Sequence, residues 1–235
     1  MFRSLSTILG YRIEATDGEI GRVHDFFFDD RDWTVRYLVV ETGPWLMHRQ
    51  VLIAATALGR PDWEAGKFPV ALAKEQVRQS PDVDTQKPVS RQEEIAMSAH
   101  YGWPSYWSLE PIPIGMPAVE VPPEKLEGDP HLRSLREIST YHVISGEHDA
   151  GAVEDYIADE NTWGIRWLLV THGAWWLKKR VLVEAGMVSR ISWAEQRVFI
   201  RPDRETLRSS PPFDAAGGIS EEYQRRLKEH YGQPG

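Results

Sequence analysis

Residues 33–40 read Trp-Thr-Val-Arg-Tyr-Leu-Val-Val, and residues 163–170 read Trp-Gly-Ile-Arg-Trp-Leu-Leu-Val, 130 positions later. The same offset aligns residues 3–104 with residues 133–234 without a gap, and 30 of the 102 aligned positions are identical. Unrelated sequences of ordinary composition match at about 6% of positions. The chain therefore contains an internal duplication, whose unit has the size of a small domain and not of a solenoid repeat.

The duplication predicts two domains joined by a connector. We expect a first repeat at residues 1–104, a linker at 105–130 and a second repeat at 131–235. The linker is rich in proline, which fixes φ and lacks a backbone N–H, so we expect an extended segment. With one lysine and five acidic residues, the linker has a charge of −4, half of the formal net charge of −8.

The composition excludes several classes of protein. The chain has no cysteine, which rules out disulfides, Cys-ligated zinc, iron–sulfur clusters and thiol nucleophiles. It shows no secretory signal, and no apolar run approaches the roughly 20 residues that span a bilayer, so we expect a cytoplasmic protein with no transmembrane segment. The acidic balance argues against a general nucleic-acid binder.

Within each repeat the pattern predicts short β-strands. Residues 35–40 form a nearly continuous apolar run, typical of a strand that is buried on both faces. Turns recur every 8–12 residues, which is typical of a small barrel or sandwich. The strands expected in the first repeat are 10–16, 19–29, 33–42, 45–53 and 68–72, and those expected in the second include 175–183 and 198–200.

Each repeat is expected to end in a short helix. The sequence from Ser90 to Glu93 matches a capping box. Met97 and Tyr101 are four residues apart, as are Leu227 and Tyr231 in the second repeat. Each pair therefore lies on one helix face and can pack against the strands.

These segments resemble the PRC-barrel family, named after the cytoplasmic domain of the photosynthetic reaction-centre H subunit and also found at the C-terminus of a ribosome maturation factor. The resemblance implies a mainly β fold of two tandem small β-barrels, each followed by a short C-terminal helix. The second repeat departs from the pattern at Glu147-His148-Asp149, and the chain lacks the membrane helix of the reaction-centre subunit, so a photosynthetic role does not transfer. The matching segments are 17–25, 33–40, 45–53, 80–81 and 100–107, with 151–155, 163–170 and 175–183 in the second repeat.

Two charged positions recur inside the apolar strands, Asp25 with Asp155 and Arg36 with Arg166. If the intervening hairpin turns near Asp30, the aspartate faces the arginine or its neighbour on the next strand. We therefore expect structural ion pairs, Asp25 with Arg36 and Asp155 with Arg166, in preference to catalytic groups.

Other polar groups favour structural roles. The aspartates at 29, 30 and 32 are expected to form a solvated turn, since a cation loop would need further oxygen ligands. His100 and His230 recur before a Tyr-Gly pair, where a histidine can bond terminal helix carbonyls. No nucleophile elbow, phosphate loop or dinucleotide fingerprint is present. We therefore expect no catalytic residue, no metal and no cofactor.

The strongest candidate surface follows Trp45 and its counterpart Trp175, where aromatic and basic residues share one strand. Aromatic side chains and arginine are enriched at protein interfaces and also stack on bases. Alternation assigns Trp45 and Trp175 to the core. The residues expected at the interaction surface are His48, Arg49, Trp176, Lys178, Lys179 and Arg180.

The sequence thus predicts a non-enzymatic binding or assembly module that contacts a protein partner or associates with itself through its barrel surfaces. The alternative is a ligand- or metal-responsive protein with a site between the two pseudo-symmetric barrels. Binding of nucleic acid by the segment 178–180 and hydrolytic activity are weaker alternatives.

Overall fold

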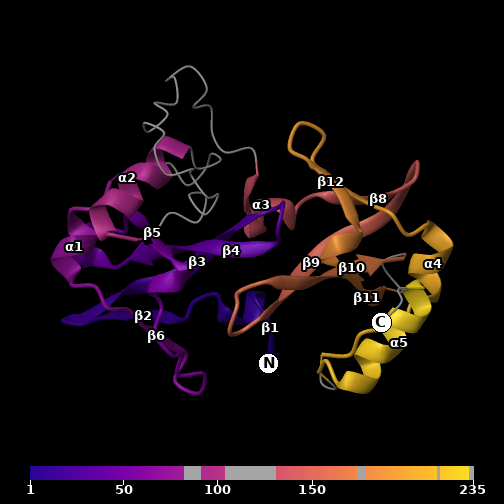
Figure 1. Cartoon of the computed structure of the whole chain (residues 1–235), viewed down its shortest axis with the longest axis horizontal. Coiled ribbons are helices and arrows are strands. Elements are labelled where there is room, and N and C mark those ends of the chain that lie inside the picture. The colour runs from indigo at the N-terminus through magenta and orange to yellow at the C-terminus, as the bar shows by residue number, and fades with distance from the viewer. Residues whose placement is uncertain (82–90, 104–130, 174–177, 216–217, 233–235) are drawn as a thin grey trace, which may run out of the picture. The chain divides into compact units, whose positions relative to one another are not determined.

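The computed structural model describes residues 1–81, 91–103, 131–173, 178–215 and 218–232. The protein is mainly β, as predicted, with two sheets and short helices (Figure 1). No helix in the described ranges is long and apolar enough to cross a membrane.

The larger sheet is built mainly from the second repeat. Its strands β8 and β13 pair in parallel and the other pairs are antiparallel. The order is β11 (Lys179–Glu184), β10 (Ile165–His172), β9 (His148–Asp159), β8 (His142–Ser145), β13 (Arg197–Ile200) and β12 (Val188–Ser192), and β1 (Phe2–Ser4) also pairs with β9.

The smaller sheet repeats this topology with first-repeat strands. Its order is β5 (Gln50–Ala54), β4 (Thr34–Thr42), β3 (Gly18–Asp29), β2 (Arg12–Ala15) and β6 (Lys67–Pro69), and β7 (Leu132–Ser134) also pairs with β3. In neither sheet do the end strands of this order pair with each other among the described residues.

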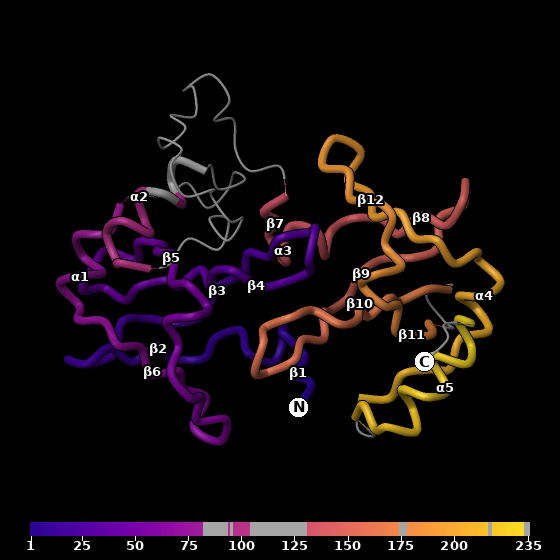
Figure 2. The backbone as a smooth tube through the Cα atoms, viewed as in Figure 1, coloured from indigo at the N-terminus to yellow at the C-terminus, as the bar shows by residue number. Residues whose placement is uncertain are grey.

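The chain forms two compact units, and each contains segments of both repeats. The second-repeat unit comprises Met1–Ile8, Asp29–Val35 and Ser134–Gly235, and the first-repeat unit comprises Leu9–Phe28 and Arg36–Arg133. In the second-repeat unit, the N-terminal segment runs beside β9 (Figure 2).

One cluster of core residues in each unit lies between a sheet and a C-terminal helix. The predicted helices are confirmed as α2 (Arg91–Tyr101) and α5 (Glu221–Tyr231), and each buries an apolar residue, Met97 or Leu227. Leu132 lies in the core of the first-repeat unit, and its counterpart Phe2 packs against the core of the second-repeat unit. The other equivalent core residues are Phe27, Tyr37, Val39 and Leu52 in one unit and Ile157, Trp167, Leu169 and Leu182 in the other.

Short helices fill the remaining connections. They are η1 (Ser6–Ile8), η2 (Pro44–Leu46), η3 (Ala55–Ala57), α1 (Lys74–Arg78), α3 (Leu135–Ile138), η6 (Ala185–Met187) and α4 (Arg204–Ser209). The strand expected from residue 45 begins only at Gln50, because Pro44 starts a 3₁₀ turn that includes Trp45.

Candidate functional site

A pocket with a volume of about 1030 Å³ lies in the second-repeat unit. Its walls come from the adjoining ends of β9, β10 and β11 and from one face of α4. Leu207 of α4 is buried and holds this helix against the sheet, while Arg204 and Arg208 line the pocket. These arginines are four residues apart, so they share one helix face.

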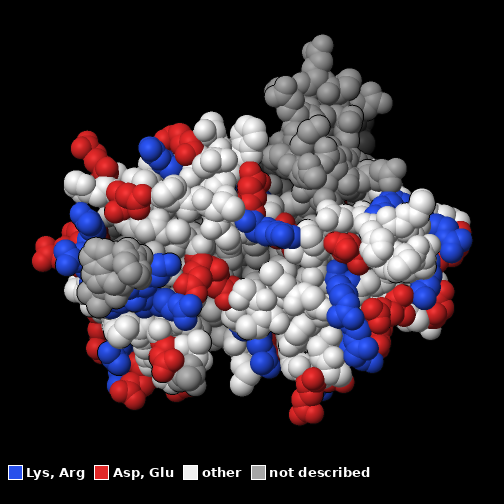
Figure 3. Space-filling view, turned by 180° about the vertical axis from the view of Figure 1, so that it is seen from behind, with Lys and Arg blue, Asp and Glu red and all other residues white. Residues whose placement is uncertain are grey.

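Three cations of the pocket form no ion pair with any carboxylate in the described parts of the chain. They are Lys178, Arg204 and Arg208, and all three side chains are exposed. In the space-filling view, several Lys and Arg surfaces lie close together on the second-repeat unit, with Asp and Glu surfaces beside them (Figure 3). A cavity lined by cations of this kind attracts anionic groups, and arginine binds carboxylate or phosphate oxygens through two parallel hydrogen bonds.

The two other predicted cations of this segment have internal partners. Lys179 donates from Nζ to the carbonyl oxygens of Arg208 and Ser210, both at 2.6 Å. Arg180 contacts Glu154 with an Nη2–Oε1 distance of 2.5 Å. Lys178 is therefore the predicted residue of this segment whose charge is available in the pocket.

His172 contributes a neutral polar group to the wall. Burial lowers its pKa, and the nearby charges of Lys179, Arg208 and Arg204 lower the pKa further. The imidazole is therefore uncharged at pH 7, and its Nε2 is buried without a hydrogen-bond partner among the described residues. Such a nitrogen can donate to or accept from a bound group, depending on its tautomer.

Gly151 allows the strands at the pocket to approach closely. Its φ is +123°, and a Cβ atom there would lie 2.1 Å from the carbonyl oxygen of Thr171. Gly21 makes the same approach to Glu41 in the first-repeat unit, also at 2.1 Å. The recurrence of this glycine in the duplication thus reflects backbone packing between neighbouring strands.

The equivalent position in the first-repeat unit has different chemistry. Its smaller pocket, of about 390 Å³, is lined by Glu19, Glu41, His24 and His48 among others. His24 and His48 lie 3.5 Å and 3.7 Å from the two carboxylate oxygens of Glu41. This pocket combines two carboxylates and two imidazoles with one arginine, Arg22. Its counterpart is lined by five lysine and arginine side chains and one carboxylate, that of Asp149.

Arg49, predicted at the interaction surface, is half-buried and has an internal role. Its guanidinium donates to the carbonyl oxygens of Arg78 at 3.2 Å, Ser80 at 2.6 Å and Pro81 at 2.8 Å. Lys179 holds the equivalent carbonyls in the second repeat. These bonds explain a basic residue at this position of both repeats through its contact with the end of a short helix.

Of the three predicted tryptophans in these segments, the structure describes one. Trp45 is half-buried and donates from Nε1 to the carbonyl oxygen of Ile20 at 2.6 Å. Trp175 and Trp176 lie outside the described residues.

Asp155 and Arg166 have other partners than each other. Asp155 accepts hydrogen bonds from the hydroxyls of Ser4 and Ser6, while Arg166 lies 3.5 Å from Glu184. The structure corrects the expected facing of Asp155 and Arg166, because Asp155 lies opposite Leu169. The hairpin turns later than expected, with Ala158 opposite Ile165, and a register shift before Trp167 moves the pairing by one more residue. In the first repeat, Asp25 is buried and accepts from the amide of Phe26 at 2.7 Å, and Arg36 is half-buried on β4.

The aspartates of the hairpin turn bond their own loop. Asp29 is buried and pairs with Arg31 at 2.7 Å, and Asp32 accepts from the amide of Thr34 at 3.1 Å. No cluster of three metal-ligating side chains occurs in the described ranges.

The recurrent histidines also bond backbone carbonyls, as expected. The carbonyls belong to the short helix before each C-terminal helix, and not to the end of the helix that carries the histidine. His100 lies 2.7 Å from the carbonyl oxygen of Gln76 in α1, and His230 lies 2.8 Å from that of Thr206 in α4. They thus hold each C-terminal helix against the short helix before it.

Sequence reasoning missed Arg204 and Arg208. Their spacing of four residues was a usable signal, and so was their alignment with Lys74 and Arg78 in the first repeat. Their position beside residues 178–180 depends on the packing of α4 against the start of β11. Local sequence patterns do not specify this packing.

No protein-family model matches this chain, and no curated protein matches it at a significant level.

Proposed function

We propose that this protein is a non-enzymatic binding module whose basic pocket takes an acidic segment of a partner protein. The observation that carries the proposal is the group of three exposed cations around the pocket, Lys178, Arg204 and Arg208, which have no carboxylate partner in the described structure. Charge complementarity of this type steers association and selects partners. The two PRC-like barrels form part of the proposal. They are supported by the two β-sheets, in which equivalent strands of the two repeats follow the same order.

The experiment compares two double variants. Arg204→Gln with Arg208→Gln removes two pocket charges, while Arg225→Gln with Arg226→Gln removes two exposed charges from α5, outside the pocket. We expect a labelled oligoglutamate peptide to bind the unaltered protein and the α5 variant alike, and to bind the pocket variant at least about tenfold more weakly, or about 1.4 kcal/mol. Fluorescence anisotropy at two salt concentrations measures this difference.

Equal binding by both variants would contradict the proposal, as would no binding to the unaltered protein. Circular dichroism shows whether both variants keep their fold.

The second candidate function is response to a small anionic ligand. The volume of the pocket favours it, because about 1030 Å³ is enough for a small molecule. The site would then lie within one unit and not between the barrels. Calorimetric titration with pyrophosphate and citrate distinguishes the two: a small anion that binds tightly and displaces the peptide favours ligand response, whereas binding of the peptide alone favours a protein partner.

A further inference from the structure

Each sheet contains a strand supplied by the other repeat. In the second-repeat unit, β1 pairs antiparallel with the C-terminal part of β9, with Phe2 opposite Asp159 and Ser4 opposite Ile157. The amide of Glu160 donates to the carbonyl of Met1, and the amide of Leu5 donates to that of Tyr156, both at 2.9 Å. These backbone bonds satisfy groups of β9 that would otherwise lie at an open sheet edge.

Apolar contacts fix the exchanged strand. The ring of Phe2 lies edge-on to Trp167 with centroids 4.7 Å apart, and Phe2 packs against the core that contains Leu227. Buried aromatic pairs in this geometry add stabilisation beyond the area that they bury. The strand therefore packs against the core of the second-repeat unit through Phe2.

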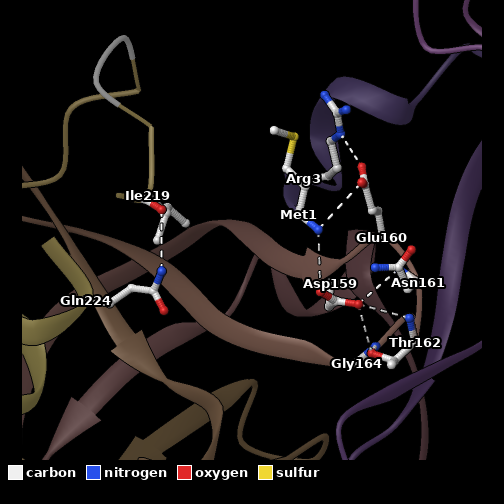
Figure 4. A network of polar contacts seen from close by, with 9 residues as sticks. All are labelled: Met1, Arg3, Asp159, Glu160, Asn161, Thr162, Gly164, Ile219 and Gln224. Carbon is white, nitrogen blue, oxygen red and sulfur yellow. Dashed lines mark hydrogen bonds and ion pairs between the residues drawn. The ribbon is translucent and has the colours of Figure 1, made fainter. Parts of the chain in front are cut away.

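Polar contacts surround the same strand (Figure 4). The N-terminal ammonium lies 3.7 Å from Asp159 and 3.5 Å from Glu160, and Arg3 bonds Glu160 at 2.9 Å. Although burial acts to raise the pKa of Asp159, bonds from Asn161 and Thr162 and the N-terminal charge lower it. Asp159 is therefore ionised at neutral pH and attracts the N-terminus.

A further set of contacts anchors the strand through Asp155. This buried carboxylate accepts from the amide of Ser6 at 3.0 Å and from the hydroxyls of Ser6 and Ser4. The carboxylate that recurs in the apolar strand of the second repeat therefore binds a segment of the first.

The contacts between the repeats are reciprocal. The amide of Val35 donates to the carbonyl of Trp163 at 3.0 Å, and the amide of Ile165 donates to that of Trp33 at 2.6 Å. These two bonds are related by the 130-residue offset. The pairing of β7 with β3 and of β1 with β9 is related in the same way. Reciprocity, in which residue i contacts j and the equivalent of j contacts the equivalent of i, is the pattern of an isologous dimer interface.

We propose that the two repeats are held together as the subunits of a strand-exchanged dimer are, and that the edge of β9 accepts the strand Phe2–Ser4 even when that strand belongs to a separate polypeptide. The partner that this edge fits is a second copy of the repeat, and here that copy is fused to the first. Cutting the linker therefore leaves the two fragments joined by their exchanged strands.

The cysteine-free chain permits a direct test. A protease site is inserted in the linker, and Arg3→Cys is combined with Ala158→Cys, because Arg3 and Ala158 are paired neighbours in the sheet. Antiparallel neighbours lie within the Cα separation that a disulfide spans. After oxidation and cleavage, we expect the fragments to migrate together on a non-reducing gel and to separate after reduction.

The matched control combines Arg3→Cys with Phe28→Cys, which is the position equivalent to Ala158 in the strand's own repeat. We expect no link between the cleaved fragments and no internal disulfide by mass spectrometry. An internal disulfide in this control, with no link in the first variant, would overturn the proposal.

A measurement without cysteines covers the case in which a variant fails to fold. The cleaved protein, otherwise unaltered, is analysed by size exclusion with light scattering. We expect the mass of the intact chain, and separation into two smaller particles under native conditions would also overturn the proposal.

Discussion

At the scale of single residues, the two repeats use different side chains to bond the same backbone carbonyls. The guanidinium of Arg49 and the ammonium of Lys179 both bond carbonyls at the end of a short helix that follows them in the chain, α1 or α4, and of the Ser-Pro turn after it. Arginine offers several donors in a fixed plane, whereas lysine offers a compact charge. Both can satisfy carbonyl groups that the helix leaves without partners.

This equivalence predicts the effect of two substitutions. Arg49→Ala removes a charged donor from three carbonyl groups, two of them in part-buried hydrogen bonds, and should lower the free energy of unfolding by about 2 kcal/mol. Arg49→Lys should recover at least half of that loss, because the second repeat uses lysine at this position. Urea denaturation of the three proteins provides the measurement, and equal stability of Arg49→Ala and the unaltered chain would show that these bonds contribute nothing.

At the scale of secondary-structure elements, one glycine determines how closely two neighbouring strands approach each other. Gly151 lies on β9 where the register with β8 shifts, and the backbone of Thr171 on β10 occupies the space that a side chain would need. The positive φ adds a second reason, since residues with a Cβ rarely adopt it. Both features are local to this pair of strands.

Gly151→Ala should therefore destabilise the protein by more than about 2 kcal/mol, because the strands must separate or the backbone must change. Gly186→Ala provides the control, since a Cβ at Gly186 meets no atom within 4 Å and its φ is not positive. Thermal denaturation of both variants measures the difference. Similar melting temperatures would contradict the role assigned to the close approach.

The strands that have strong patterns were predictable from the sequence. The run 35–40 is buried over most of its length, as its apolar character indicated, and both C-terminal helices form. The exchanged strands β1 and β7 were not predicted, because three residues carry no periodicity and local sequence does not choose between two similar acceptor edges. The bonds from Ser4 and Ser6 to Asp155 were not predicted either, because they depend on the position of β1.

The basic pocket was predictable only in part. The cations at 178–180 were visible in the sequence, but their roles differ because Lys179 and Arg180 have internal partners. Such partners arise from tertiary packing of α4 and β9, so composition alone did not separate them from Lys178.

At the scale of the whole molecule, the connectivity links the stability of the two compact units. The chain passes from one unit to the other after Ile8, Phe28, Val35 and Arg133. The segments 1–8 and 29–35 belong to the second-repeat unit, while residues 9–28 between them belong to the first-repeat unit. If one unit unfolds, the chain segments that enter the other unit lose their anchor at one end. We therefore expect the units to unfold together.

Differential scanning calorimetry should show one transition, with a calorimetric enthalpy equal to the van't Hoff enthalpy. Cleavage of the linker should leave a single transition, because residues 105–130 contribute to none of these four crossings. Two separate transitions in the uncut protein would show that the units unfold independently.

The fusion of the repeats has a consequence for how their two equivalent pockets can diverge. In a dimer of identical chains, every substitution appears at both sites, so a change that suits one is imposed on the other. In this chain each site has its own codons. The cations around Arg204 and Arg208 and the histidines around Glu41 show that this freedom has been used. Gene duplication has therefore allowed one repeated scaffold to carry two pockets lined by different charged groups.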